Sequence, residues 1–190
     1  MQRRQLLSLL GATSALPLAA SLSGCGFQLR RPQSMAFQSI QLKGFTAASP
    51  LAAELARNLE ASGVAVVDSV AQAAERAGGG QVPRGHLVFE ALRDTQEQAV
   101  ATKTAFGQVR SMTVRNRLRF QVRRADGSLL LEPADINLDR DLSFNEQDAL
   151  AKQDESAALN RAMQTDIVQQ VMRRLQAIRA EQLVAPPATP

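Results

Sequence analysis

Residues 112–122 alternate between two kinds of side chain, and this alternation constrains the fold more than any other stretch of the chain. Successive side chains of a strand point to opposite faces, so a strand here has one apolar face and one charged face. The even positions are mainly apolar: Met112, Val114, Asn116, Leu118, Phe120 and Val122. The other face carries a row of four arginines, called the arginine comb below: Arg115, Arg117, Arg119 and Arg123. We expect helices to cover the apolar face and leave the comb on the other side.

The arginine comb has a candidate partner strand after the turn sequence Ala-Asp-Gly-Ser at 125–128. Pairing through this turn would place Arg115 opposite Asp139 and Thr113 opposite Asp141. Pro133 predicts an irregularity before the second strand, because proline lacks the N–H that a ladder needs. The comb therefore has two interpretations. Its arginines pair across strands, at about 0.2–1 kcal/mol per pair, or the surplus positive charge binds anions or faces a partner, since two acids cannot neutralise four bases.

The rest of the chain supplies further strands and two helices. Ser49 and Pro50 are typical of a helix start, and the leucines at 51, 55 and 59 give that helix one apolar stripe. A long helix over about 147–179 has a similar stripe from Leu159 to Ile178. Strands are expected at 36–42, 64–67 and 86–95, with a surface loop at 69–84 and a polar link at 96–104. We expect an α+β fold with one four-stranded, mostly antiparallel sheet and two helices packed on one face. This single domain would span 35–180 and precede a disordered tail at 181–190.

The N-terminal segment 1–24 predicts a lipoprotein signal peptide. Two arginines precede an apolar stretch that is too short and too rich in Gly, Pro and Ser to span a bilayer. Leu22-Ser23-Gly24-Cys25 looks like a lipobox, and Cys25 is the only cysteine of the chain. We expect acyl chains on Cys25, followed by a tether over 25–34; the alternative is a plain signal peptide with an incidental cysteine. The export route, general or twin-arginine, stays open.

Several classes of function are disfavoured. The leader removes two of the 22 basic residues and none of the 18 acidic ones, so the mature protein is nearly balanced and no nucleic-acid partner is expected. His86 is the sole histidine, which excludes a site with several histidine ligands, and it is expected at the surface or at a sheet edge. No nucleophile elbow is present. We therefore expect no enzyme, no metal and no cofactor.

Two segments resemble one known family. The start Cys25-Gly26-Phe27-Gln28-Leu29-Arg30, directly after a lipobox, is similar to that of the lipopolysaccharide-assembly lipoprotein family LptE. The order of elements is similar as well, including an Ala-Leu-Ala-Lys block (149–152) that opens a C-terminal helix. The resemblance spans about 25–180. Gly26 after the cysteine, by resemblance to known lipoproteins, suggests sorting to the outer membrane.

The resemblance implies a function. Members of this family sit as a plug inside the outer-membrane β-barrel LptD, help it assemble, and bind lipopolysaccharide during its delivery to the cell surface. Their basic residues contact the lipid's phosphates, which points to Lys152 at the family's Ala-Leu-Ala-Lys position and to Lys103 near a second basic position. The comb residues Arg115, Arg117 and Arg119 are further candidates. The alternative is an envelope structural or assembly lipoprotein that binds only protein.

Overall fold

The structure is a computed structural model that describes residues 35–78, 85–144 and 149–184. The predicted signal peptide (1–24), the predicted lipidation site Cys25 and the whole of the predicted tether (25–34) lie outside these residues and stay predictions. Within the described residues, none of the helices combines the length and apolar character needed to cross a membrane.

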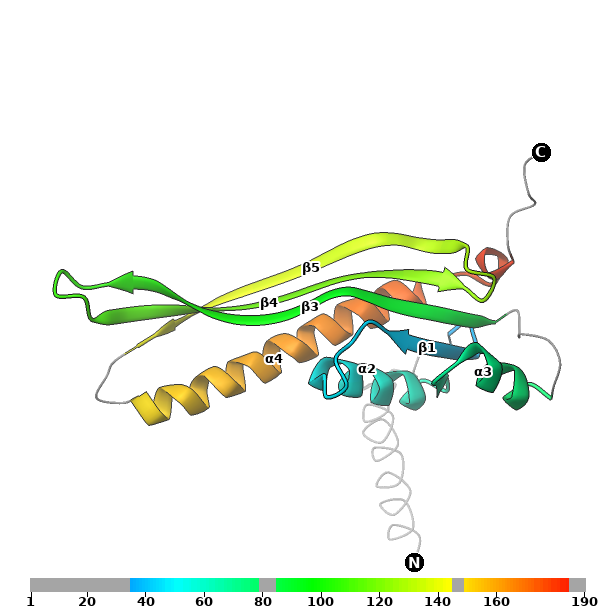
Figure 1. Cartoon of the computed structure of the whole chain (residues 1–190), viewed down its shortest axis with the longest axis horizontal. Helices are drawn as coiled ribbons and strands as arrows, with labels where there is room; N and C mark the ends of the chain where they lie inside the picture. The colour runs from blue at the N-terminus through cyan, green and yellow to red at the C-terminus, as the bar shows by residue number, and fades with distance from the viewer. Residues whose placement is uncertain (1–34, 79–84, 145–148, 185–190) are drawn as a thin grey trace, which may run out of the picture. The chain divides into compact units, whose positions relative to one another are not determined.

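Three long antiparallel strands form most of the sheet (Figure 1). They are β3 (His86–Lys103), β4 (Val109–Arg124) and β5 (Leu129–Ser143). Two short strands, β1 (Ser39–Lys43) and β2 (Ala65–Val67), extend the sheet beyond β3. The order is β2-β1-β3-β4-β5, with β1 parallel to both of its neighbours. The expected α+β class is confirmed, but over the residues that the structure describes the sheet has five strands and is mixed, rather than four-stranded and mostly antiparallel.

The predicted hairpin register is confirmed. Arg115 pairs with Asp139 and Thr113 with Asp141 in the β4–β5 ladder. The irregularity expected at Pro133 is present too, because the pairing shifts there, between Phe120 and Val122 on the partner strand. Alternation along both strands and the turn sequence between them were sufficient to predict this part of the sheet.

In the described part of the chain three α-helices accompany the sheet, one more than expected. In α2 (Pro50–Ala61), Ser49 is the N-cap and its side chain accepts a hydrogen bond from the N–H of Ala52 at 3.2 Å. The long helix α4 (Ala149–Gln176) and α2 pack on the same face of the sheet (Figure 1). The third helix, α3 (Val70–Arg76), is capped by Ser69 and lies beside β2.

Two stretches differ from their predicted structure. The surface loop expected at 69–84 contains α3, and its part at 79–84 lies outside the described residues. The polar link expected at 96–104 is a strand, because β3 continues to Lys103 while paired with β4. The backbone ladder extends β3 there although most side chains of this extension are exposed, so no apolar alternation marks it. The predicted tail begins inside a short 3-10 helix (Ala180–Leu183), held by a hydrogen bond from Arg124 Nε to the carbonyl of Gln182 at 2.7 Å.

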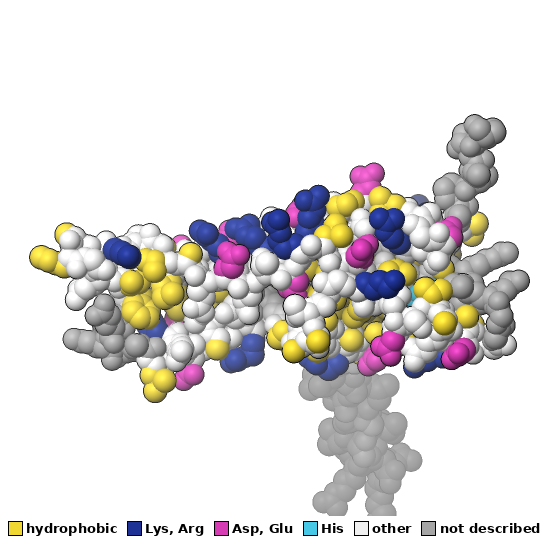
Figure 2. All heavy atoms as spheres, viewed as in Figure 1, with side chains coloured by type: hydrophobic (Ala, Val, Ile, Leu, Met, Phe, Trp, Pro, Cys, Tyr) yellow, Lys and Arg dark blue, Asp and Glu magenta, His cyan; other side chains and the backbone are white. Residues whose placement is uncertain are grey.

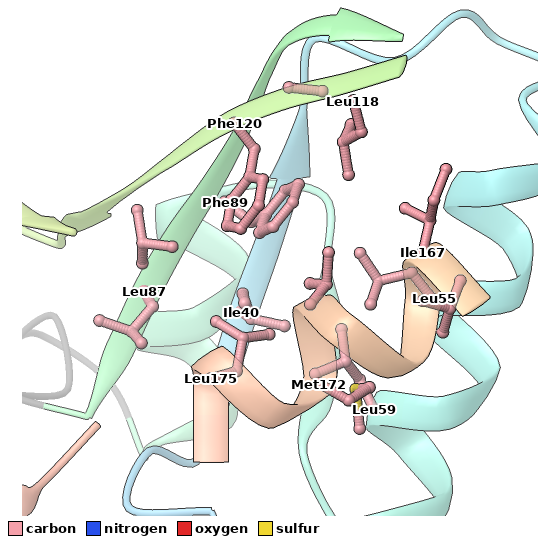
Figure 3. Packing of buried hydrophobic residues seen from close by; sticks show 14 of the residues in the cluster. Ile40, Leu55, Leu59, Leu87, Phe89, Leu118, Phe120, Ile167, Met172 and Leu175 are labelled. Atoms are coloured by element: carbon pink, nitrogen blue, oxygen red, sulfur yellow. The ribbon is translucent and has the colours of Figure 1, made fainter. Parts of the chain in front are cut away.

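The core lies between the sheet and the two helices at the end of the sheet that carries β1 (Figure 3). Phe89 and Phe120 stack with ring centroids 4.8 Å apart. Burying each such side chain contributes about 1.5–3 kcal/mol. The helices contribute these residues to the core cluster: Leu51, Leu55, Leu59, Ile167, Val168, Val171, Met172 and Leu175. The core anchors one half of the long strands and leaves the other half to extend beyond it with α4 alone.

Candidate functional site

A groove lies between α4 and the half of the sheet that extends beyond the core. Its volume is about 430 Å³, within the range of small-molecule sites. Its apolar wall comes from the inward faces of β4 and β5 and from the first turn of α4: Met112, Val114, Leu142, Phe144 and Leu150. Its polar lining is Gln98, Lys152, Gln153 and Ser156. The groove thus combines an apolar wall with one cationic side chain.

Lys152 is the charged group of this groove. Its Nζ donates to Glu155 Oε2 at 2.6 Å and to Ser143 Oγ at 3.3 Å, and 20% of its side chain is exposed. Ion pairs between residues three or four apart on a helix contribute only about 0.2–0.5 kcal/mol. An anion arriving at the groove would therefore replace Glu155 as the partner of Lys152 at little cost.

Exposed apolar side chains lie around the same end of the domain. Leu150 in the groove wall is 76% exposed, Phe106 at the β3–β4 turn is 94% exposed, and Val100 on β3 is 46% exposed. Figure 2 shows hydrophobic side chains gathered toward this end of the sheet. Exposed apolar patches mark binding or membrane-contact surfaces more often than chance.

The arginine comb is on the opposite face from the groove. Arg115 Nε and Arg117 Nη2 both approach Asp139 Oδ1, at 3.9 Å and 3.4 Å. Arg123 Nε lies 3.4 Å from Glu90 Oε2. Figure 2 shows a row of basic side chains along the side of the sheet away from the helices. The comb is therefore paired over most of its length, as the first of the two interpretations predicts.

The structure separates the predicted site residues into three places. Lys152 lines the groove on the helix side, whereas the comb lies on the other face. Lys103 is at the end of β3, exposed and outside the groove lining, although it lies toward the same end of the domain as Lys152 (Figure 1). Sequence reasoning missed the groove itself, because the groove forms only where α4 crosses the extended strands. It also missed Arg93 of β3, which faces the comb.

His86 is not at the surface, and that expectation was wrong. It is fully buried at the start of β3, with its Nδ1 3.0 Å from Ser39 Oγ on β1. Burial lowers the pKa of His86, and the nearby positive charge of Lys43 lowers it further. Among the described residues, no group of three or more His, Cys, Asp or Glu side chains is placed to hold a metal ion.

Comparison with known proteins places these features in a family. The family model described as LptE, lipopolysaccharide-assembly, matches residues 37–175, a range that includes most of the core, the comb and the groove lining. No curated protein sequence matches the chain.

Solved structures share the fold. A lipoprotein B from Nitrosomonas europaea has a TM-score of 0.62 and 23% identity over 80% of this chain and 91% of that one. The rare lipoprotein B from Shewanella oneidensis has a TM-score of 0.56 and 18% identity, covering 73% and 93%. A minor lipoprotein from Acinetobacter baumannii has a TM-score of 0.56 and 18% identity, covering 74% and 92%.

Proposed function

This chain belongs to the LptE lipopolysaccharide-assembly family, and we propose that it binds lipopolysaccharide and partners the LptD barrel in the outer membrane. The observation that carries the lipid-binding part is the apolar groove with Lys152 in its lining. On this proposal the protein acts by recognition and performs no catalytic step.

The groove matches the two chemical halves of the lipid. Lipopolysaccharide joins anionic phosphates to apolar acyl chains. The ammonium of Lys152 would bind a phosphate oxygen by charge-assisted hydrogen bonds, in place of Glu155. The apolar wall formed by Leu142, Phe144 and Leu150 would contact the acyl part and remove it from water, at about 0.8 kcal/mol per buried methylene.

The proposed location of the protein in the cell and its proposed barrel partner are based on the N-terminal sequence and on the family. We propose that Cys25 is acylated and that the acyl chains hold the domain at the outer membrane, facing the periplasm. The domain would plug the lumen of the barrel and assist its assembly. Barrel interiors are polar, so a charged sheet face such as the comb would be compatible with that surrounding.

The lipid-binding part is tested with the full-length lipidated protein and purified lipopolysaccharide. The test variant is Lys152→Glu, and the matched control is Arg161→Glu, which changes the same charge on an exposed residue of α4 outside the groove. We expect Lys152→Glu to weaken binding by about tenfold or more, equivalent to 1.4 kcal/mol. Equal affinity for both variants and the unmodified protein would contradict a site at Lys152.

The barrel partnership has a separate test. Affinity purification of the full-length protein from its native outer membranes should recover one large β-barrel protein in a stoichiometric amount. Recovery without any barrel would overturn the partnership. Barrel recovery with no lipopolysaccharide binding by any variant would instead support a lipoprotein that binds only protein.

A further inference from the structure

Two arginines face each other directly at the middle of the comb. The β3–β4 ladder places Arg93 opposite Arg119, next to an irregularity between Ala91 and Arg93 that leaves Leu92 unpaired. Both arginines are exposed, and neither forms an ion pair with a described residue. Like charges directly opposite each other destabilise a sheet. The fold therefore places two like charges opposite each other, and neither is held in an ion pair by a described carboxylate.

The surrounding charges leave this spot positive. Toward one end of the comb, Arg115 lies between Glu97 on β3 and Asp139 on β5, and toward the other end Arg123 pairs with Glu90. On β5 the residue opposite Arg119 is Asp135, but the two side chains form no ion pair. The excess positive charge is thus concentrated at the ladder position that pairs Arg93 with Arg119.

We propose that Arg93 and Arg119 form the centre of a docking surface for an acidic patch of a protein partner. Guanidinium groups bind carboxylates through paired hydrogen bonds, so Asp and Glu side chains of a partner would separate the two arginines and neutralise both. The open face of a sheet fits a protein surface. Asp135 and Asp139 lie on the same face, so an anionic occupant must place its charges at separate points that avoid them. Carboxylates spaced over a folded protein surface can do this, whereas the phosphates of one lipid headgroup carry their charge close together, and this favours a protein as the occupant.

This inference rests on the proposed function for the identity of the partner, the outer-membrane barrel. It separates the two binding activities by face: the lipid in the groove beneath α4, and the barrel against the side of the sheet away from the helices. Removing the two arginines should therefore raise the stability of the free protein and weaken its binding to the barrel. The stability rises because the repulsion is relieved, and the binding weakens because the contact with the partner is lost.

The test compares Arg93→Gln/Arg119→Gln with the control Arg161→Gln/Arg173→Gln, which removes the same charge from exposed positions of α4. The full-length proteins are expressed in the native host, and barrel capture, lipopolysaccharide binding and thermal unfolding are measured. We expect the test variant to unfold at a higher temperature than the unmodified protein and to capture several-fold less barrel at low salt. The deficit should shrink as salt screens the contact. Lipopolysaccharide binding should be unchanged, and the control should capture the barrel normally.

Other outcomes overturn the inference in distinguishable ways. Equal barrel capture by the test variant and the unmodified protein contradicts it and leaves the proposed function intact. Loss of lipopolysaccharide binding with normal barrel capture assigns the arginines to the lipid instead. A lower unfolding temperature means that the pair stabilises the fold and is not an unfavourable contact. If even the unmodified protein captures no barrel, the proposed partnership fails and this inference fails with it.

Discussion

Arg115 lies directly opposite Asp139 in the β4–β5 ladder, with its Nε 3.9 Å from Oδ1 of that aspartate. The same Oδ1 accepts a hydrogen bond from Arg117 Nη2 at 3.4 Å. One aspartate thus forms ion pairs with two neighbouring arginines of the comb. This sharing explains how a strand with four arginines on one face remains compatible with a stable sheet. Among the described residues, Arg119 at the middle of the comb forms no ion pair, although Asp135 lies opposite it on β5.

Asp139→Asn should weaken the fold slightly, because it removes the carboxylate shared by Arg115 and Arg117, two like charges on the same face of β4. Both ion pairs are solvent-exposed, so we expect a loss of about 0.2–1 kcal/mol. Urea denaturation measures it, and the loss should diminish at high salt. A loss of several kcal/mol would contradict the surface character of these pairs.

Gly44→Ala should be strongly destabilising. Gly44 has φ of +80°, and a Cβ added there would lie 2.1 Å from the carbonyl oxygen of Ala91. Strain in this backbone region alone costs about 1–3 kcal/mol, and the clash with backbone adds to it. Gly107→Ala is the control, since Gly107 has φ of +83° but open space around its Cβ position. Equal unfolding midpoints for the two variants would show that the clash is relieved at no cost.

Stability should fall as the pH is lowered through the ordinary pKa of histidine, 6.5. Burial lowers the pKa of His86 in the folded state, so the unfolded chain takes up a proton first. The contribution of the neutral side chain is therefore fully present above pH 6.5 and is lost below it. Urea unfolding at pH 7.5 and at pH 5.5 measures the difference. Because the chain has no other histidine, His86→Gln should reduce this slope; an unchanged slope would assign it to carboxylates.

Leu150→Ser should reduce lipopolysaccharide binding without reducing stability. The side chain is 76% exposed and lines the groove, so its removal costs the fold within about 0.5 kcal/mol. Phe120→Ala provides the contrast, because loss of a fully buried phenylalanine costs about 3–5 kcal/mol. A large drop in the unfolding midpoint of Leu150→Ser would mean that this residue belongs to the core instead.

Local signals were sufficient to predict parts of the fold. The cap at Ser49 and the leucine stripe after it predicted α2, and the alternation on both sides of the turn at 125–128 predicted the β4–β5 register. These elements bury one face against a core, so apolar residues recur in their sequences at the spacing of a helix or of a strand. The extension of β3 beyond Thr95 buries little, and its polar sequence therefore looked like a link.

The candidate site depended on contacts between distant segments. His86 is buried beside β1, where it is hydrogen-bonded to Ser39, 47 residues away in the sequence, and nothing local to His86 indicates this. Arg93 could not be placed opposite Arg119 without knowing the irregularity beside Leu92 in the β3 pairing. Lys152 was singled out by the resemblance of its neighbouring residues to a family, whereas the groove that it lines requires α4 and the sheet together.

The most direct test of lipid recognition in the groove is photo-crosslinking in living cells. A photoreactive amino acid replaces Leu150 in one variant of the full-length protein and the exposed residue Arg161 of α4 in another. We expect a covalent adduct with lipopolysaccharide from position 150 and none from position 161. Adducts of equal yield from both positions, or from position 161 alone, would contradict it.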